Sequence, residues 1–522
     1  MRRIISFVLA CTFLVLSACS LEDPSLDVTE SPNQQKNQQQ PEPEMDTVFG
    51  IAYAEEEHMN PLATQNKVNL ELYGLVFEGL FEINDKFEPE YLLCDSYTVE
   101  GNTYRMHIKQ GVTFSDGSAL QASDVVASLR LAKEEASYYA PRLANIASVR
   151  ADGGDTVVIT LNRMNGNLPR LLDVPIIKKG SEEDKVALGT GGYVLQADEQ
   201  NGGYILTARE GWHLGKNRPY ARIELTKVGT VDELIFGFES HDIDLVTVDS
   251  TSADPIQFRG EYESREYPTT VMQYLGFNMR RDLFSNALVR QAVTCAIDRE
   301  NAVEQDYARL ADATLLPIHP ASPAYDGEIA KNFSFSLENA KGFFTAAGYT
   351  DQNGDGKLDN GRRGALGFEI LVNSENKSRC AVARRISQDL AKIGVTVTIR
   401  EAKWEEYMRA LEQGEFDAYL GEVNLTADFE LDRLVRSGGA LNYGRYASSD
   451  TDALLDAYHT ATLRKSDETA NFYQNFVLQA PIAPILFKKN TAITHRGFFE
   501  TITPTQRNPY YHFFDWKPVK HG

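Results

Sequence analysis

The chain has 522 residues, more than a single ordinary core accommodates, so two or three lobes are expected. Its apolar, aromatic and charged fractions of 42%, 10% and 24% are those of a globular protein. The formal net charge of -22 would repel a phosphate backbone, which makes nucleic acid an unexpected partner.

The N-terminus has the pattern of a secretion signal. Two arginines precede an apolar stretch, residues 4–16, that is too short for a spanning helix but has the length of a signal peptide. The stretch ends in Leu16-Ser17-Ala18-Cys19, which resembles a bacterial lipobox. The resemblance implies that residues 1–18 are removed and that Cys19 carries the lipid anchor, including palmitate. An ordinary secretory signal that contains a cysteine by chance is the alternative.

Residues 19–45 are rich in Ser, Pro, Asn and Gln and hold almost no large apolar side chains, which predicts a disordered, lipidated tether. Beyond the N-terminus, no apolar run approaches the ~20 residues that a membrane span requires. The secretion signal and the lipobox resemblance imply that the body lies outside the cytoplasm, on the periplasmic side if the host has two membranes. Cys94, Cys295 and Cys380 show no metal-binding spacing and are expected to be buried free thiols.

The folded body alternates short strand-like runs with longer helix-like runs, which predicts mixed α/β lobes. Residues 104–108 alternate as a half-buried strand and lead through a turn to a helix capped by Ser123 or Asp124. Residues 286–303 have the apolar periodicity of a second helix. Residues 339–347 predict a third helix that ends at Gly348.

A strand–helix–strand unit is predicted over residues 370–399, with strands at 370–372 and 395–399 around a helix at 381–393. The polar loop before it resembles the first nine positions of a calcium-binding loop. Its oxygen ligands at positions 1, 3, 5 and 9 would be Asp351, Asn353, Asp355 and Asp359. A structural calcium ion is one expectation, and a plain turn rich in Asp and Gly is the other.

Several segments together resemble the family 5 extracellular solute-binding proteins, which include the oligopeptide- and dipeptide-binding proteins. Residues 104–129, "YRMHIKQGVTFSDGSALQASDVVASL", are similar to the family signature of strand, Gly-Val-x-Phe-x-Asp-Gly turn and Ala-x-Asp-Val helix. Residues 189–193 are similar to its Gly-Thr-Gly-Pro-Tyr turn, with Gly192 in place of proline. Residues 274–303 match its Val-Arg-Gln-Ala and Ala-Ile-Asp-Arg pattern.

The resemblance implies an α/β fold with a two-lobed, type II periplasmic-binding-protein-like clamp and an additional inserted subdomain. The implied limits are 46–70, 185–265 and 475–522 for lobe I, 71–184 for the inserted subdomain and 266–474 for lobe II. Such a clamp closes over a ligand that contacts both lobes.

The implied function is that of a substrate-binding lipoprotein of an ABC importer, which captures a small solute, expected to be a peptide, and delivers it to the permease subunits. The protein is expected to act as a monomer and to need no cofactor. In oligopeptide binders an acidic residue in a Trp-x-Ala-Asp-Tyr segment holds the amino terminus of the ligand. Here the corresponding stretch, residues 421–428, lacks the tryptophan and offers Glu422 or Asp428. The full set of predicted ligand-binding residues is Glu57, Tyr274, Asn278, Trp404, Tyr407, Gly421, Glu422, Asn424, Asp428 and Asn442.

Two other functions remain open from the sequence. A surface receptor for signalling or adhesion would use the same clamp. The second alternative function is that of a lipoprotein hydrolase. The Gly-x-Ser-x-Gly and His-Glu-x-x-His motifs are absent, however, so no enzyme activity is expected.

Overall fold

The computed structural model describes residues 48–216, 218–249, 251–252, 256–361 and 364–519. The predicted signal peptide, the lipidated Cys19 and the predicted tether lie outside the described residues. Within the described ranges, none of the helices has the length and apolar character that a membrane crossing demands.

The first sheet has four strands in the order β1-β10-β9-β8. β1 is parallel to β10, and the other neighbours are antiparallel. Every residue of β1 is buried, and the Phe49 ring stacks on Tyr220 at 5.1 Å and on Phe513 at 5.4 Å. The strands are β1 (Phe49–Tyr53), β8 (Tyr193–Ala197), β9 (Tyr204–Ala208) and β10 (Arg222–Lys227), accompanied by helices α1 (Lys67–Leu72) and α3 (Val231–Glu239).

A second sheet, inserted in the chain between β1 and β8, has the order β4-β5-β7-β6 and is antiparallel throughout. Its strand β5 buries Tyr104, Met106 and Ile108, which confirms the predicted alternation. The following helix begins earlier than predicted. Gln121 is its N-cap, and the carboxylate of Asp124 accepts the Gln121 backbone N–H at 2.8 Å from within the first turn. The strands of this sheet are β4 (Cys94–Glu100), β5 (Thr103–Ile108), β6 (Ile146–Ala151) and β7 (Thr156–Leu161), accompanied by helix α2 (Ala122–Ala132). Before them in the chain, β2 (Phe81–Ile83) and β3 (Pro89–Tyr91) form a separate antiparallel two-stranded sheet.

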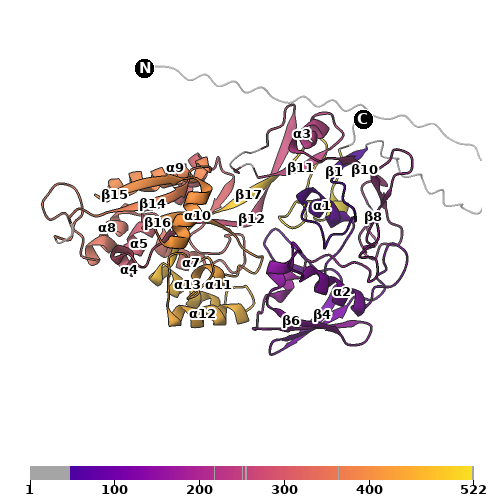
Figure 1. Cartoon of the computed structure of the whole chain (residues 1–522), viewed down its shortest axis with the longest axis horizontal. Coiled ribbons are helices and arrows are strands. Elements are labelled where there is room, and N and C mark those ends of the chain that lie inside the picture. Colours follow the sequence, from indigo (N-terminus) through magenta and orange to yellow (C-terminus); the bar gives the residue numbers. More distant parts are fainter. Residues whose placement is uncertain (1–47, 217, 250, 253–255, 362–363, 520–522) are drawn as a thin grey trace, which may run out of the picture. The chain divides into compact units, whose positions relative to one another are not determined.

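The largest sheet has the order β11-β17-β12-β16-β14-β15, and β13 pairs with β17. Its two long strands, β12 and β17, are antiparallel to each other, whereas β14 is parallel to both of its neighbours. Helix α9 connects β14 to β15 and packs on both, which confirms the predicted strand–helix–strand unit (Figure 1). The strands are β11 (Leu245–Val248), β12 (Tyr262–Phe277), β13 (Ala311–Ala313), β14 (Gly367–Asn373), β15 (Thr396–Ala402), β16 (Ala418–Asn424) and β17 (Ile482–His495).

The helix predicted over 286–303 is two helices, α5 and α6, which corrects the sequence-based expectation. Asp298 caps α6 by accepting the Asn301 backbone N–H at 3.1 Å, and the buried Arg299 donates to the Thr294 and Ile297 carbonyls. The predicted helix that ends at Gly348 is α8. Around the largest sheet lie α4 (Asp282–Ser285), α5 (Ala287–Cys295), α6 (Arg299–Asp306), α7 (Gly327–Ala330), α8 (Leu337–Ala346), α9 (Lys377–Ala391), α10 (Trp404–Gln413), α11 (Asp432–Val435), α12 (Ser449–Thr460) and α13 (Asp467–Gln479).

The buried apolar side chains form separate clusters. One combines residues from 49–245 with residues from 499–516, so the first two sheets share a core with the C-terminal segment. Two further clusters contain residues from 272–487, apart from Phe87, which belongs to one of them. β17 contributes Ile485 to one of these and Ile493 to a small cluster around α3 and β11. The exact domain limits given above remain predictions.

The three cysteines among the described residues, Cys94, Cys295 and Cys380, are buried free thiols, as the sequence predicted. Burial raises the pKa of Cys94 to about 12 and that of Cys295 to about 11. These thiols therefore stay protonated at neutral pH and act as small apolar side chains.

Candidate functional site

A cleft of about 400 Å³ lies between the loops that flank β6 and β7 and the segment from β16 to α12. This volume falls in the range of small-molecule pockets, roughly 300–1,000 Å³. One wall is formed by Pro141, Arg142, Ala144, Asn145, Arg163, Asn165 and Leu171, and the other by Val423, Asn424, Leu425, Thr426, Asp428, Glu430, Asp432, Arg433, Leu434, Leu441 and His459.

Asp428 is a buried carboxylate that connects the two walls of this cleft. It is 2% exposed, and it accepts a hydrogen bond of 2.9 Å from the Asn165 side-chain amide on the opposite wall. Thr426 on its own wall donates a second bond. The turn that presents it ends in Phe429 at a φ of 49°, a left-handed conformation uncommon for a bulky residue. Because a carboxylate has about four acceptor positions, Asp428 retains capacity for a further donor.

The rim of the cleft carries a cluster of opposite charges around Asp432. Arg163 from one wall contacts Asp432 and lies 3.4 Å from Asp456. Arg436 contacts the same two carboxylates at 3.0 and 2.6 Å, and His459 Nε2 lies 3.0 Å from Asp432. Although burial acts in the opposite direction, the His459 hydrogen bond and the Arg163 charge hold the pKa of the Asp432 carboxyl far below its usual range.

A segment that starts at Asn165, here called the bridging segment (residues 165–170), fixes one wall against the other. Gly166 donates its backbone N–H to the His459 carbonyl at 2.7 Å. The Asn167 side chain donates to the Ala461 carbonyl at 2.9 Å and accepts from the Leu463 backbone at 2.7 Å. These contacts connect the loop after β7 to backbone groups at and just beyond the end of α12.

A second polar network lies where β12, β16 and β17 pair. Lys488 is buried and contacts Asp249 at 2.6 Å and Glu422 at 3.8 Å. Glu422 also accepts the Gln273 amide at 2.8 Å. Beside it, Asn424 accepts a 3.0 Å bond from the Thr270 hydroxyl. This network ties a carboxylate of β16 to a cation of the long strand β17.

Of the predicted ligand-binding residues, Asn424 and Asp428 line the cleft, and Glu422 lies in the adjoining network. The others are placed elsewhere, and their roles as ligand contacts remain predictions. Side chains bonded within the fold are Tyr274 (to Tyr419), Asn278 (to Gly414 and Phe416), Tyr407 (to Leu420) and Asn442 (to Arg436 and Tyr446).

Gly421 packs directly on Tyr274, since a Cβ there would lie 2.6 Å from that ring. Trp404 is exposed and stacks on Tyr407 at 5.9 Å. Glu57 has a side chain that is 91% exposed, with His58 at 3.9 Å.

The sequence-based prediction missed the wall contributed by Arg142, Arg163 and Asn165. Arg142 forms a buried ion pair of 2.6 Å with Asp173, which lies 31 positions away. The only local signal is the polar, glycine-containing run from 162 to 167 directly after a strand. Loops that follow strands are common positions for binding residues.

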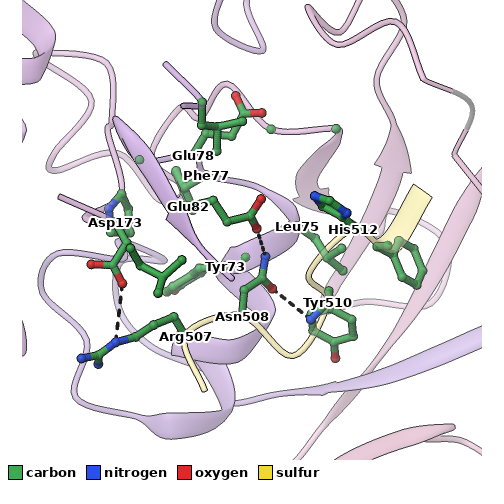
Figure 2. Close-up of a pocket in the computed structure, with 18 of the residues that line it drawn as sticks. Tyr73, Leu75, Phe77, Glu78, Glu82, Asp173, Arg507, Asn508, Tyr510 and His512 are labelled. Atoms are coloured by element: carbon green, nitrogen blue, oxygen red, sulfur yellow. Dashed lines mark hydrogen bonds and ion pairs between the residues drawn. The ribbon is translucent and has the colours of Figure 1, made fainter. Parts of the chain in front are cut away.

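A smaller cavity of about 100 Å³ is lined by residues of α1, β2 and the start of β8, by neighbouring loops and by the C-terminal segment (Figure 2). Figure 2 shows the Glu82 carboxylate bonded to the Asn508 amide, at 2.9 Å, and Arg507 paired with Asp173. Burial raises the pKa of Glu82 to about 7. The volume is too small for a peptide, so the larger cleft is the better candidate site.

The predicted calcium loop is an exposed turn. Asp351 accepts the backbone N–H groups of Gly354 and Gly356 at 2.8 and 3.0 Å, and Asp355 accepts that of Lys357 at 2.8 Å. These bonds use the carboxylates within the loop itself. Calcium binding by Asp351, Asn353, Asp355 and Asp359 stays a prediction, which a calcium titration of the purified protein would test.

The fold defines the class of this protein. The α/β cores of this chain, which the long strands β12 and β17 connect, have the type II periplasmic-binding-protein fold. Solved structures that share it include the oligopeptide-binding protein AppA from Bacillus subtilis in complex with a nonapeptide, with a TM-score of 0.58, 22% identity and coverage of 92% of this chain and 100% of that one. The unliganded open form of the murein tripeptide binding protein MppA matches with a TM-score of 0.74, 19% identity and coverage of 91% and 98%.

The chain belongs to family 5 of the bacterial extracellular solute-binding proteins, because residues 88–437 match the family model described as "Bacterial extracellular solute-binding proteins, family 5 Middle". This is a family of solute-binding proteins of ABC importers. The Bacillus subtilis oligopeptide-binding protein AppA is 26% identical over 92% of each chain. Heme-binding protein A from Haemophilus influenzae is 24% identical over 76% of this chain and 78% of its own.

Proposed function

We propose that this chain is the substrate-binding subunit of an ABC importer and that it captures a peptide in the cleft around Asp428. The observation that carries the proposal is the buried carboxylate of Asp428, which lines the cleft and contacts both walls. A peptide brings an ammonium group at its amino terminus, and a sheltered carboxylate with unused acceptor capacity is its natural partner.

The comparison with named relatives supports a peptide over other solutes. A protein named for oligopeptide binding is similar over 92% of both chains. Other relatives are named for heme or glutathione, and each covers a smaller share of this chain, 76% and 62%. Charge in the cleft agrees, because the Arg433 guanidinium in the wall suits the carboxylate end of a peptide.

We also propose that the protein is a monomer anchored through Cys19 and that it delivers its bound ligand to membrane permease subunits. Its activity is binding and not turnover. The lipobox-like Leu16-Ser17-Ala18-Cys19 supports the anchor. If the anchor is correct, Cys19→Ser moves the protein from the membrane fraction to the soluble fraction, and a variant that stays with the membrane contradicts it.

The experiment compares a short peptide with its N-acetylated form by isothermal titration calorimetry. A charged hydrogen bond contributes about 1.5–3 kcal/mol, so the free amino terminus is expected to bind about 10–100-fold more tightly. Asp428→Asn keeps an acceptor for Asn165 but removes the charge, so it is expected to abolish this preference. Asp456→Asn, at the exposed rim, is the matched control and should keep it.

Glu422→Gln tests the other carboxylate named by the sequence. If this variant, and not Asp428→Asn, loses the preference, the ligand's amino terminus lies at the β16–β17 network. Failure of a broad peptide mixture to bind or to raise the melting temperature of the wild-type protein would reject the peptide assignment.

A further inference from the structure

Two histidines and an aspartate come together on the α3–β11 side of the molecule, among residues that do not line the cleft. One ring nitrogen from each of His241 and His495 and one carboxylate oxygen of Asp244 lie within 4.8 Å of one another. His241 and Asp244 belong to the turn between α3 and β11, and His495 is the last residue of β17, the strand paired with β11 (Figure 1). The pairing of β11 with β17 thus unites groups that are about 250 positions apart in sequence.

The three side chains have the donor types that transition metals prefer. Imidazole nitrogen and carboxylate oxygen bind Zn²⁺ at about 2.0–2.2 Å, which leaves donor atoms of one ion roughly 3.3 Å apart. The His241 and His495 rings lie against each other, with centroids 3.9 Å apart and planes inclined by 30°. Because the lone pair of an imidazole nitrogen lies in the plane of the ring, His241 has to turn for both rings to reach one ion. His241 is exposed and can turn to complete the approach.

The surroundings of the cluster orient its members. Asp244 accepts the Gly50 backbone N–H at 2.7 Å through Oδ2, while Oδ1 lies 3.8 Å from His495. His495 Nε2 lies 3.2 Å from the Ile243 carbonyl, which can only accept a proton. In the tautomer that has its proton on Nε2, the contact with Ile243 holds the ring in place, and Nδ1 of His495 carries the lone pair that a metal ion would take.

His241 has a strained backbone conformation, and the stacking of its ring on His495 is the packing contact that the structure gives it. It follows the helix cap Ser240 and has a φ of 66°, in a position where glycine is usual. An exposed side chain gains little there, and a left-handed non-glycine residue costs about 1–2 kcal/mol. A ligand for His241 would account for its presence.

A second group of possible metal ligands, Glu430, Asp432 and His459, is less suited to a metal ion. Its aspartate already pairs with Arg163 and Arg436, so a metal cation would meet two positive charges. In the described part of the chain, neither lysine nor arginine forms an ion pair with Asp244.

We propose that His241, Asp244 and His495 form a binding site for a divalent transition metal ion, outside the solute cleft. Three protein ligands leave a coordination position for water. The bound ion would join the turn after α3 to the end of β17 and thereby stabilise this part of the fold. The proposal does not depend on which solute the cleft binds.

The test uses the purified full chain after treatment with a chelator, titrated with ZnCl₂ by calorimetry and with CoCl₂ by visible absorption. We expect one Zn²⁺ per chain, a higher melting temperature with Zn²⁺, and Co²⁺ absorption bands of a nitrogen–oxygen site. His241→Asn keeps a residue that tolerates positive φ but removes the imidazole, and Asp244→Asn removes the charge. Each should weaken Zn²⁺ binding by about tenfold or more.

His58→Asn is the matched control, since His58 is also a surface histidine beside carboxylates, at 3.9 and 4.0 Å, and it should leave Zn²⁺ binding unchanged. Absence of saturable Zn²⁺ binding to the wild-type chain would overturn the proposal. So would equal binding by His241→Asn, or loss of binding in His58→Asn alone. The Co²⁺ spectrum of the wild-type chain decides the question if a variant does not fold.

Discussion

Three carboxyl groups of this protein have different pKa values because their surroundings differ. Asp432 keeps a very low pKa despite burial, because His459 and Arg163 lie against it. Glu82 and Asp244 have pKa values raised to about 7, because burial acts on them without a cation in contact. At the residue scale, therefore, the presence of an opposite charge decides whether a buried acid is ionised at neutral pH.

Glu82 provides a test of stability against pH. Its pKa is about 7 in the folded protein, above the ordinary value of 4.5. The folded state therefore binds a proton that the unfolded state has released, and the resulting stability is fully present below pH 4.5 and is lost as the pH rises through 7. Glu82→Gln mimics the protonated acid and still accepts from Asn508, so we expect it to be more stable than the wild type at pH 8 by roughly 3 kcal/mol and equal at pH 4.

Urea unfolding at several pH values measures this difference. Glu100→Gln, on the exposed edge of β4, is the control and should show no pH-dependent gain. A Glu82→Gln variant whose stability follows the wild type at every pH would show that Glu82 titrates normally.

At the scale of elements, the two walls of the cleft are held by the bridging segment and not by a sheet. Its contacts run from backbone to backbone at Gly166 and from the Asn167 side chain to two backbone groups near the end of α12. A Cβ at Gly166 would lie 2.5 Å from the Thr460 carbonyl oxygen. The close approach requires glycine at this position.

Gly166→Ala is therefore expected to destabilise the protein by about 1–3 kcal/mol and to weaken solute binding, because the two walls must separate. The matched control is Gly342→Ala within α8, where a Cβ would have open space. That change should stabilise the protein by up to about 1 kcal/mol through helix propensity and a less flexible unfolded chain. Thermal unfolding of both variants checks the pair, and a neutral Gly166→Ala would mean that the contact is not maintained.

At the scale of the whole described molecule, β12 and β17 are shared between cores. β17 reaches from Ile485 in one cluster to Ile493 in another, and β12 pairs with it over most of that length. The pairing is interrupted by register shifts at Pro268–Met272 and Gln273–Tyr274. Irregularities of this kind interrupt ladder hydrogen bonds, which makes these residues candidates for hinge positions.

We expect ligand binding to change the angle between the cores through this pair of strands. Small-angle scattering of the purified protein should show a smaller radius of gyration with a bound peptide than without it, because the ligand contacts both walls only in the closed form. Asp428→Asn should reduce this response at equal peptide concentration. A radius of gyration that stays constant with a saturating ligand would contradict the clamp mechanism.

Local pattern predicted much of the fold and part of the site. Strand β5 and the unit of β14, α9 and β15 follow from side-chain periodicity, which the backbone geometry imposes over a few residues. The break between α5 and α6 was missed, because it depends on Asp298 as a cap and on the reach of Arg299 into the core. Asp428 could be found from its segment, whereas Arg163 could not, since its partner Asp432 is 269 positions away.

The sequence by itself determined the family, the α/β class and the acidic stretch from 421 to 428, because motif spacing and periodicity are local properties of the chain. Only the tertiary structure decided that Asn165 faces Asp428, and that His495 joins His241 and Asp244. Both arrangements depend on which distant strands and loops become neighbours. That choice is made by burial and packing of the whole chain, which no local pattern records.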